Sequence, residues 1–369
     1  MTQRPLVAVL FGGRSSEHSV SCVTAAGVMN EIDPNAFRLL PIGITPEGKW
    51  RVVNDWKSFA FDRDNMPQVA DNQTEVFVSP SRNGSLIERD AQGAFTDLGS
   101  PDIVFPLLHG KYGEDGAMQG LLTLLDAPFV GPGVFASAAG MDKHFTKMVL
   151  RAAGIPTAEW KTITLAQYNA DPNAAIDSLQ ELGLPAFVKP SRAGSSVGIS
   201  KVSDTSGFKA ALDDAFAHDT KVIVEPFVDG REIECAVLGS VNDDELKASS
   251  PGEITVSGDH EFYDFDAKYL DLDATTLTCP ADVEPEVAER VREIACQTFR
   301  AFDCSGLTRV DTFVRPNGEV LVNEINTSPG FTPSSGYPVM WQNSGLPYRD
   351  LITELLTIAV EDHKRATTA

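Results

Sequence analysis

The segment Arg309–Phe331, RVDTFVRPNGEVLVNEINTSPGF, has the alternation of a β-hairpin but carries two acids in its strands. Asn317-Gly318 is a preferred two-residue hairpin loop, because both residues tolerate a positive φ. That loop places Asp311 directly opposite Glu324, and like charges in this position destabilise a sheet. The opposite face, which we expect to pack into the core, holds Val310, Thr312, Val314, Leu321, Asn323 and Ile325.

A divalent cation would remove the repulsion between the two facing acids. Asn326 follows Glu324 by two residues and shares its face, so it adds an amide oxygen. Two carboxylates and an amide are hard ligands, which suit Mg²⁺ beside phosphate oxygens. Arg309 lies opposite Asn326 and gives a second interpretation, in which it neutralises the acids in a structural ion pair. The hairpin alone leaves both interpretations open.

The composition limits the partners of the chain. Its 369 residues suggest two or three domains, and its net charge of -22 argues against binding to nucleic acid or to anionic membranes. No apolar run approaches the ~20 residues of a membrane-spanning helix, and Leu6–Phe11 is too short for a signal peptide and reads as a buried strand. Five cysteines without a C-x-x-C pair predict neither a disulfide framework nor a zinc site. We therefore expect a soluble, reduced, cytoplasmic protein.

The N-terminal third of the chain alternates strand and helix patterns. Strands are expected at 6–11, 37–45 and 102–110, and helices from Glu17 onward and at 117–128. Such alternation predicts an α/β unit with a largely parallel sheet, whose ligands bind beyond the carboxyl ends of the strands. GGRSSEH (12–18) and HGKYGEDG (109–116) lie at such ends.

Two further units follow. The second contains an expected helix at 141–155 that ends near Gly154, a strand, glycine-rich loop and strand at 186–202, and a strand, connector and strand at 222–238. The third holds the hairpin and a helix at 285–302, whose expected packing face is Val287, Val291, Ile294, Thr298 and Phe302.

The loop KPSRAGSSVG (189–198) has the composition of a phosphate-binding cover. Gly194 and Gly198 let backbone N–H groups approach an anion, and Lys189 supplies a positive charge. It is not a Walker A loop, since it lacks G-K-[ST], and a plain turn between strands is the alternative. A glycine-rich cover, a preceding lysine and a downstream acid pair are together typical of phosphoryl transfer.

The connector VEPFVDGRE (224–232) follows a buried strand and carries two acids. Its backbone could meet an adenine edge, and Glu225 or Glu232 could hold ribose hydroxyls. The alternative is that both are exposed acids without a ligand.

These motifs, in this order, resemble the ATP-grasp superfamily and, within it, the D-alanine–D-alanine ligase family. The resemblance spans residues 12–332 and rests on the segments GGRSSEHSVS, LHGKYGEDGAMQG, GPGVFASAAGMDK, VKPSRAGSSVGISKV, FYDFDAKY, GLTRVDTF and NEINTSPGFT. It implies an ATP-grasp fold of the α/β (α+β) class. The implied parts are an N-terminal α/β domain at 1–135, a central subdomain at 136–228, and a C-terminal subdomain with a lid loop and a magnesium site at 229–369.

The resemblance also implies roles for individual residues. Those similar to the family's ATP contacts are Lys143, Lys189 and Lys268 at the phosphates, and Glu225, Glu232 and the backbone of Phe227 and Val228 at the adenosine. Those similar to the ligands of two Mg²⁺ (or Mn²⁺) ions are Asp311, Glu324 and Asn326. Those similar to the D-alanine contacts are Glu17 and His109 at the first ammonium, and Arg309, Gly330 and Ser335 at the second carboxylate and the developing oxyanion. Ser195 and Tyr269 resemble the partners of Glu17 in a trio that closes the site.

The implied reaction joins two D-alanine molecules to D-alanyl-D-alanine at the expense of ATP. The resemblance implies an acyl phosphate intermediate, release of ADP and phosphate, a place in peptidoglycan precursor synthesis, and a homodimer. An acyl phosphate must be kept dry, so a lid is expected at GDHEFYDFDAKYLDLD (258–273), and a disordered surface loop is the alternative.

Three positions depart from the family pattern. Some members carry Glu where Ala193 stands, Lys where Pro226 stands, and a larger residue at Gly336, whose space Tyr337 is expected to fill. Competing functions are a D-alanine–D-lactate type of ligase, although Tyr269 favours an amine as second substrate, and an ATP-grasp ligase for other amino acids. A non-catalytic nucleotide-binding protein conflicts with the intact phosphate and metal positions, and a dehydrogenase with the lack of G-x-G-x-x-G.

Overall fold

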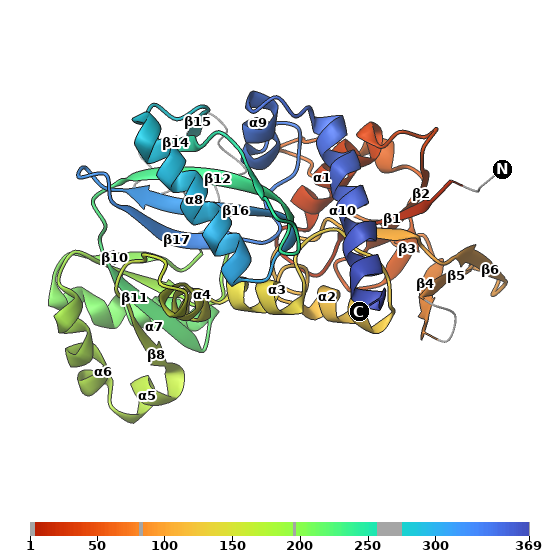
Figure 1. Ribbon diagram of the computed structural model, residues 1–369. Helices are drawn as coiled ribbons and strands as arrows, with labels where there is room; N and C mark the ends of the chain where they lie inside the picture. Colours follow the sequence, from red (N-terminus) through yellow and green to blue (C-terminus); the bar gives the residue numbers. More distant parts are fainter. Residues whose placement is uncertain (1–3, 81–83, 195–196, 257–274, 369) are drawn as a thin grey trace.

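The N-terminal part of the molecule is built on a largely parallel sheet, as expected. The computed structural model describes residues 4–80, 84–194, 197–256 and 275–368 (Figure 1). The sheet order is β3-β2-β1-β7, with strands β1 (Leu6–Gly12), β2 (Arg38–Ile44), β3 (Trp50–Val52) and β7 (Ile103–Pro106). β1 pairs in parallel with β2 and β7, and only β3 is antiparallel. The carboxyl ends of β1 and β7 therefore meet at one edge, which brings the 12–18 and 109–116 loops together.

Both faces of β1 are buried, because helices cover the sheet on each side. Val7, Val9 and Phe11 pack in a core with α1 (His18–Glu31), α9 (Gly336–Asn343) and α10 (Tyr348–Thr368). The same core includes Ala236 and Leu238 of the C-terminal sheet. This shared core fixes the N-terminal loops relative to the rest of the site.

The central part of the chain forms an antiparallel sheet of order β10-β9-β11-β8. Its strands are β8 (Lys161–Thr164), β9 (Ala186–Pro190), β10 (Ser200–Val202) and β11 (Lys221–Pro226). One face packs on α7 (Phe208–His218) through Val188, Val222 and Val224. By alternation, Lys189 and Glu225 project from the other face. The short helices α5 (Leu165–Ala170) and α6 (Pro172–Leu179) lie at the outer end of this part (Figure 1).

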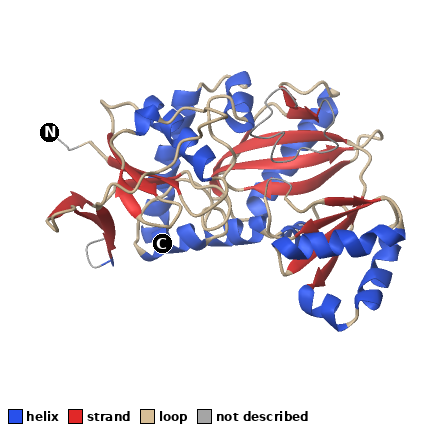
Figure 2. Cartoon of the chain, turned by 180° about the vertical axis from the view of Figure 1, so that it is seen from behind, coloured by secondary structure: helices blue, strands red, loops and turns tan. Residues whose placement is uncertain are grey.

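The C-terminal sheet has the order β15-β14-β12-β16-β17, and Figure 2 shows its long strands from behind. The strands are β12 (Arg231–Ser240), β13 (Lys247–Ala248, paired with β12), β14 (Gly252–Val256), β15 (Thr275–Thr278), β16 (Ser305–Val314) and β17 (Val320–Asn326). Helix α8 (Pro285–Ala301) covers one face through Val291 and Ile294, with Phe302 just beyond its end and Val287 packed against the same core. The expected packing face of this helix is therefore confirmed.

Three helices connect the N-terminal and central sheets, and they lie below the C-terminal sheet and α10 in the view of Figure 1. They are α2 (Ala117–Leu124), α3 (Val134–Met141) and α4 (Lys143–Ala152). A separate antiparallel sheet at the N-terminal end consists of β4 (Glu75–Ser79), β5 (Ser85–Arg89) and β6 (Phe95–Gly99).

The hairpin β16–β17 corrects one detail of the sequence analysis. Arg315 pairs with Glu319 and Gly318 has a φ of 83°, so the loop holds three residues and not two. Next to the loop, the pairing of β16 with β17 is therefore shifted by one residue from the expected register. A β-bulge at Asn323 restores the expected register farther from the loop. Asp311 therefore lies opposite Glu324, as expected.

The bulge also changes which side chains of β17 enter the core. Val320, Val322 and Ile325 pack beneath α8, in place of the expected Leu321 and Asn323. The hydrophobic side chains on both sides of the bulge thus share the buried face.

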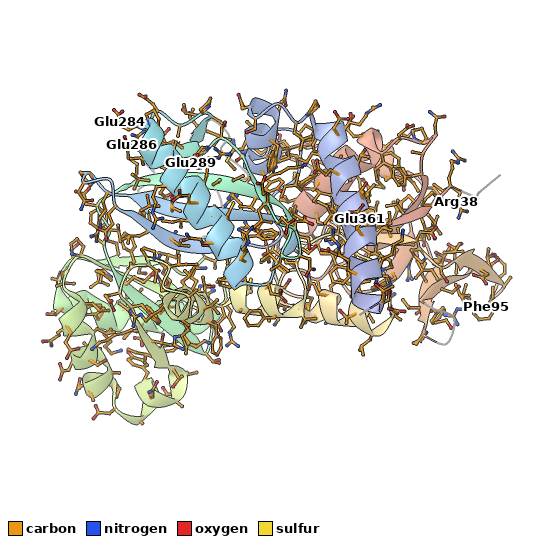
Figure 3. The ribbon with its side chains drawn as sticks, viewed as in Figure 1. Arg38, Phe95, Glu284, Glu286, Glu289 and Glu361 are labelled. Atoms are coloured by element: carbon orange, nitrogen blue, oxygen red, sulfur yellow. The ribbon has the colours of Figure 1, made fainter. Side chains whose placement is uncertain are left out.

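Exposed acids cover the outer helices. Figure 3 shows Glu284, Glu286 and Glu289 at the start of α8, and Glu361 on α10. They contribute to the net charge of -22. None of the helices in the described ranges has the length and apolar character needed to cross a bilayer.

Candidate active site

A row of three carboxylates crosses the face of the C-terminal sheet that points away from α8. Glu234 on β12 pairs with Asp311 on β16, which pairs with Glu324 on β17. Arg309, one pair further along, donates to both oxygens of Asp311 at 2.7 Å, and its Nε lies 3.2 Å from Glu234. The structural ion pair, which was the alternative interpretation of the hairpin, is therefore present in this structure.

Glu234 is a site residue that the sequence analysis missed. The signal was its spacing of two from Glu232 in a strand, which puts both acids on one face. Glu234 also accounts for the small residue at Gly336, because a Cβ there would lie 3.3 Å from Glu234 Oε2. Tyr337 does not fill this space as expected: it is fully buried, and its hydroxyl donates to the Val237 carbonyl at 2.8 Å.

The hairpin donor set fits a divalent cation with oxygen ligands. The side chains of Asp311 and Glu324 are 13% and 28% exposed, so an ion can reach them. Asn326 Oδ1 accepts from the Ser328 N–H at 3.2 Å. Within the described ranges, no three His, Cys, Asp or Glu side chains are grouped to hold a metal. A cation here would therefore need the Asn326 amide or ligand oxygens as well.

Lys143 lies between the glycine-rich loop and the hairpin. Asp142 caps α4 by accepting from the backbone N–H of His144, and it also accepts from the Ser191 hydroxyl at 2.7 Å. Lys143 Nζ donates to the Ala193 carbonyl at 3.0 Å and lies 3.5 Å from Glu324. This position, between a loop of N–H donors and an acid, suits a phosphate contact.

Two lysines hold Glu225 on the facing sheet. Lys147 lies 2.5 Å from one carboxylate oxygen and Lys189 lies 2.8 Å from the other. Burial alone would raise the pKa of Glu225, but the two lysines outweigh it and lower the pKa to about 2. Burial likewise opposes the charge of Lys189, but Glu225, Glu324 and Glu232 raise its pKa overall. The sequence analysis missed Lys147, because a lysine on a helix is normally expected to be exposed to solvent.

The N-terminal loops bring Glu17 and His109 together. Glu17 precedes α1, and a Cβ added at Gly110 would lie 2.6 Å from its Oε2. His109 is buried, and its Nδ1 lies 3.4 Å from Glu114. Burial disfavours an imidazolium here, but Glu114 and the charge of Glu17 raise the pKa of His109 overall. Glu114, in the same loop, is a third residue that the sequence analysis missed.

Gly330 and Ser335 lie next to each other before α9. The Ser335 hydroxyl accepts from the Thr332 N–H at 3.1 Å, and a Cβ added at Gly330 would lie 3.2 Å from it. A side chain at 330 would therefore crowd this hydroxyl.

The connector after β11 presents backbone close to Glu225. Phe227 is half exposed, and its N–H already donates to the Pro185 carbonyl at 2.8 Å. Val228 is buried, and Glu232 is exposed at the start of β12. Ser195, Lys268 and Tyr269, together with the expected lid at 258–273, lie outside the described residues.

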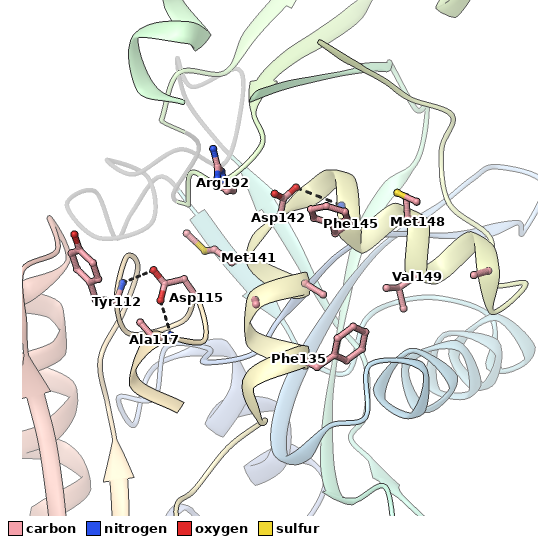
Figure 4. A pocket seen from close by; sticks show the side chains of 13 residues that line it. Tyr112, Asp115, Ala117, Phe135, Met141, Asp142, Phe145, Met148, Val149 and Arg192 are labelled. Atoms are coloured by element: carbon pink, nitrogen blue, oxygen red, sulfur yellow. Dashed lines mark hydrogen bonds between the residues drawn. The ribbon is translucent and has the colours of Figure 1, made fainter. Parts of the chain in front are cut away.

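A cavity of about 880 Å³ lies against α3 and α4 (Figure 4). Its walls come from α3, α4, the 112–117 loop and Arg192, and they are mainly apolar, with Phe135, Phe145 and Met148 among them. None of the described site residues predicted from the sequence lines it. The described residues predicted to take part in the reaction therefore lie outside this cavity.

The comparisons with known proteins agree on one family. The family model described as D-ala D-ala ligase N-terminus matches residues 6–132, and that described as D-ala D-ala ligase C-terminus matches residues 149–357. A D-alanine–D-alanine ligase of Paenarthrobacter aurescens is 50% identical over 98% of this chain and 96% of its own length. A second from Kineococcus radiotolerans is 46% identical over 97% of each chain.

Solved structures give the same result. The D-alanine–D-alanine ligase of Coxiella burnetii has a TM-score of 0.82 at 35% identity, covering 100% of this chain and 97% of that one. The VanG D-Ala:D-Ser ligase of Enterococcus faecalis has a TM-score of 0.79 at 36% identity, covering 97% and 100%. The ATP-grasp fold and the ligase class predicted from the sequence are confirmed. The chain belongs to the D-alanine–D-alanine ligase family.

Proposed function

We propose that this chain joins two D-alanine molecules to D-alanyl-D-alanine, with ATP converted to ADP and phosphate, and so supplies a peptidoglycan precursor. The observation that carries the proposal is that three parts of the chain meet. Lys143 on α4 lies 3.5 Å from Glu324 of the acidic hairpin, and the Ser328 hydroxyl, just after the hairpin, donates to the Leu108 carbonyl beside His109 at 3.5 Å. As a member of this ligase family, the chain is an ATP-dependent carboxylate–amine ligase.

The nucleotide is proposed to lie between β9–β11 and the hairpin. Lys143 and Lys189 would contact phosphate oxygens, together with Lys268, and Glu225 and Glu232 would contact the adenine and the ribose. The position of Lys143 between Ala193 and Glu324 supports its role. Because the N–H of Phe227 is already used, the backbone contact to adenine would come from its carbonyl or from Val228.

Asp311, Glu324 and Asn326 are proposed to hold two Mg²⁺ or Mn²⁺ ions. Bound there, the ions would neutralise phosphate oxygens as the γ-phosphoryl group moves to a substrate carboxylate. The facing carboxylates and their partial exposure support this assignment. Asp311 must then exchange Arg309 for the ion, and Glu234 remains beside Arg309 as its second acidic partner.

The amino acids are proposed to meet on the side of the N-terminal loops. Glu17, with His109 nearby, would receive the ammonium of the first D-alanine, whose carboxylate becomes the acyl phosphate. Arg309, the Gly330 N–H and Ser335 would hold the second carboxylate and the oxyanion that forms when the neutral amine attacks. Ser195 and Tyr269 would close the site with Glu17. Fixed donors aimed at a developing oxyanion typically lower the barrier by roughly 2.7–4 kcal/mol each.

Phosphate release with different amino acids tests the reaction. We expect ATP-dependent release with D-alanine alone, and a dipeptide product by mass spectrometry. Equal release with L-alanine would contradict the proposal. Because VanG is described as a D-Ala:D-Ser ligase, a preference for D-serine or D-lactate as second substrate would instead narrow the function to another ligase of this family.

We also propose the three domains at 1–135, 136–228 and 229–369, a homodimer, and a cytoplasmic location. The three main sheets, each in one of these ranges, support the division. Exposed Phe135, Phe145 and Met148 on α3 and α4 offer an apolar surface for a second copy. The five cysteines are all free, as in a reducing compartment. Sedimentation of the purified protein, compared with a Phe135→Glu variant, tests the dimer.

A further inference from the structure

Lys147 is a buried charge without a role in the reaction described above. It is 1% exposed, although lysine is almost never fully buried unless it is paired. Its ammonium has three N–H donors, and three acceptors surround it: Glu225 at 2.5 Å, the Thr157 hydroxyl at 2.9 Å and the Ala158 carbonyl at 3.5 Å. The fold therefore provides a complete set of partners for a positive charge at this point.

Three segments of the chain fix the position of this ammonium. Lys147 lies one turn after Lys143 on the same face of α4, so the helix directs both lysines toward acids of the candidate site. Thr157, which accepts from Lys147, donates in turn to the Val322 carbonyl on β17 at 2.9 Å. The Val322 N–H donates to the Pro156 carbonyl at 2.8 Å. Lys147 thus stands where α4, β11 and the hairpin strand β17 meet.

Lys189 differs from Lys147 in its freedom to leave Glu225. The Lys189 side chain is 14% exposed and the Lys147 side chain is 2% exposed. A contact with phosphate would draw Lys189 away from Glu225. If Lys189 were the only partner of Glu225, this movement would leave a buried carboxylate unpaired, which is strongly destabilising. The ammonium of Lys147 is instead enclosed by Glu225, Thr157 and Ala158, so it can stay on Glu225 throughout.

We propose that Lys147 is a positioning residue that holds Glu225 ionised and oriented toward the purine, and that frees Lys189 for the phosphates. This inference rests on the proposed nucleotide roles of Glu225 and Lys189. A carboxylate accepts a hydrogen bond from the exocyclic amine of adenine, whereas guanine presents a carbonyl oxygen at the same position. Lys147 therefore sets the preference for adenine nucleotides without contacting them.

The test is the Lys147→Met variant, in which a side chain of similar length lacks the charge. ADP binding is measured by calorimetry without D-alanine, and the kinetic constants are measured separately. We expect the Kd for ADP and the KM for ATP to rise about tenfold or more, with the KM for D-alanine changed by less than about threefold. The ratio of ADP to GDP affinity should fall. An unchanged Kd for ADP would overturn the inference.

A matched control separates a local effect from a general loss of stability. Lys209→Met removes a lysine from an ion pair in the same central sheet region, Lys209–Asp213 at 2.7 Å, but that pair is exposed on α7. This variant should bind ADP as the unaltered protein does. A similar weakening in both variants would assign the effect to the fold of the subdomain and contradict a positioning role.

A double variant keeps the inference testable if Lys147→Met does not fold. Glu225→Gln and Lys147→Met/Glu225→Gln remove the buried acid, so neither leaves an unpaired carboxylate. Because Lys147 acts only through Glu225, both should bind ADP equally, and a further tenfold loss in the double variant would overturn the inference. If the unaltered protein binds ADP but forms no dipeptide, the proposed reaction fails while the role of Lys147 stands.

Discussion

Glu225 and Glu324 are two acids of the candidate site in opposite physical situations. Glu225 is 5% exposed, with lysines at 2.5 and 2.8 Å. The side chain of Glu324 is 28% exposed, with Lys143 at 3.5 Å. A buried acid between close cations keeps its charge and its place, because any change of partner costs desolvation. An acid near the surface with a more distant cation can exchange that partner for an ion. The comparison teaches that burial, more than residue type, separates the fixed acid from the exchangeable one.

The hairpin acids should show the largest effect on activity. We expect Asp311→Ala and Glu324→Ala each to abolish turnover, by about 10³-fold or more, because phosphate charge is then no longer offset. Phosphate release at saturating ATP and D-alanine measures the loss, and circular dichroism checks the fold. Glu319→Ala, which breaks an exposed Arg315–Glu319 pair on the same hairpin, is the control and should remain active. Full activity in either acid variant would rule out the metal assignment.

Glu225 should show the larger effect on stability. Replacing it by Ala leaves Lys147 and Lys189 buried without their carboxylate, so we expect the free energy of unfolding to fall by about 3 kcal/mol. Glu324→Ala should change it by less than about 1 kcal/mol, since its ion pair is partly exposed. Urea denaturation of the two variants compares them directly. Equal losses of unfolding free energy in the two variants would contradict the distinction between a fixed acid, Glu225, and an exchangeable acid, Glu324.

Acid should weaken the Glu225 cluster in a defined range. The pKa of Glu225 is lowered to about 2 in the folded chain, so its ionised form stabilises the fold above the ordinary pKa and this stabilisation is lost as the pH falls. The loss should extend from about pH 4.5 toward pH 2 and amount to about 3 kcal/mol. The difference in unfolding free energy between the unaltered protein and Glu225→Gln isolates it from other carboxylates. A difference that does not change with pH in this range would contradict the assigned pairing.

The smallest expected effect is a change in the pKa of His109. Because Glu114 and Glu17 raise its pKa, charged His109 stabilises the fold at low pH, and this stabilisation is lost as the pH rises through that raised pKa. Glu114→Gln should therefore lower the pKa of His109. An NMR titration of the imidazole measures the change, with the remaining histidines as internal references. A pKa that stays the same would show that Glu114 does not interact with the ring.

In the hairpin, the predicted contact between the two acids is correct although the predicted loop length is not. Asn317-Gly318 signalled a turn, and Asp311 does face Glu324. The loop is nevertheless one residue longer than expected, and the bulge at Asn323 compensates for it. Loop length and bulges depend on the twist of the sheet and on packing beneath α8, which local preference does not contain.

The missed residues show what one strand or helix cannot reveal by itself. Lys147 lies on a helix, and only the packing of α4 against β11 buries it beside Glu225. Glu114 lies in a loop, and it meets His109 because the chain turns back at Gly110. Glu234 had a strand signal, but its meaning came from β16 lying next to β12.

The amino-acid sequence by itself determined the family, the order of strands and helices, and the residue types of the cleft. These follow from periodicity, turn residues and motifs, which are properties of short segments. Only the tertiary structure decided which acids are buried, which cation each acid meets, and that Lys147 belongs to the site. Such facts depend on contacts between segments far apart in the chain, and the free energy of a buried charge is set by those contacts.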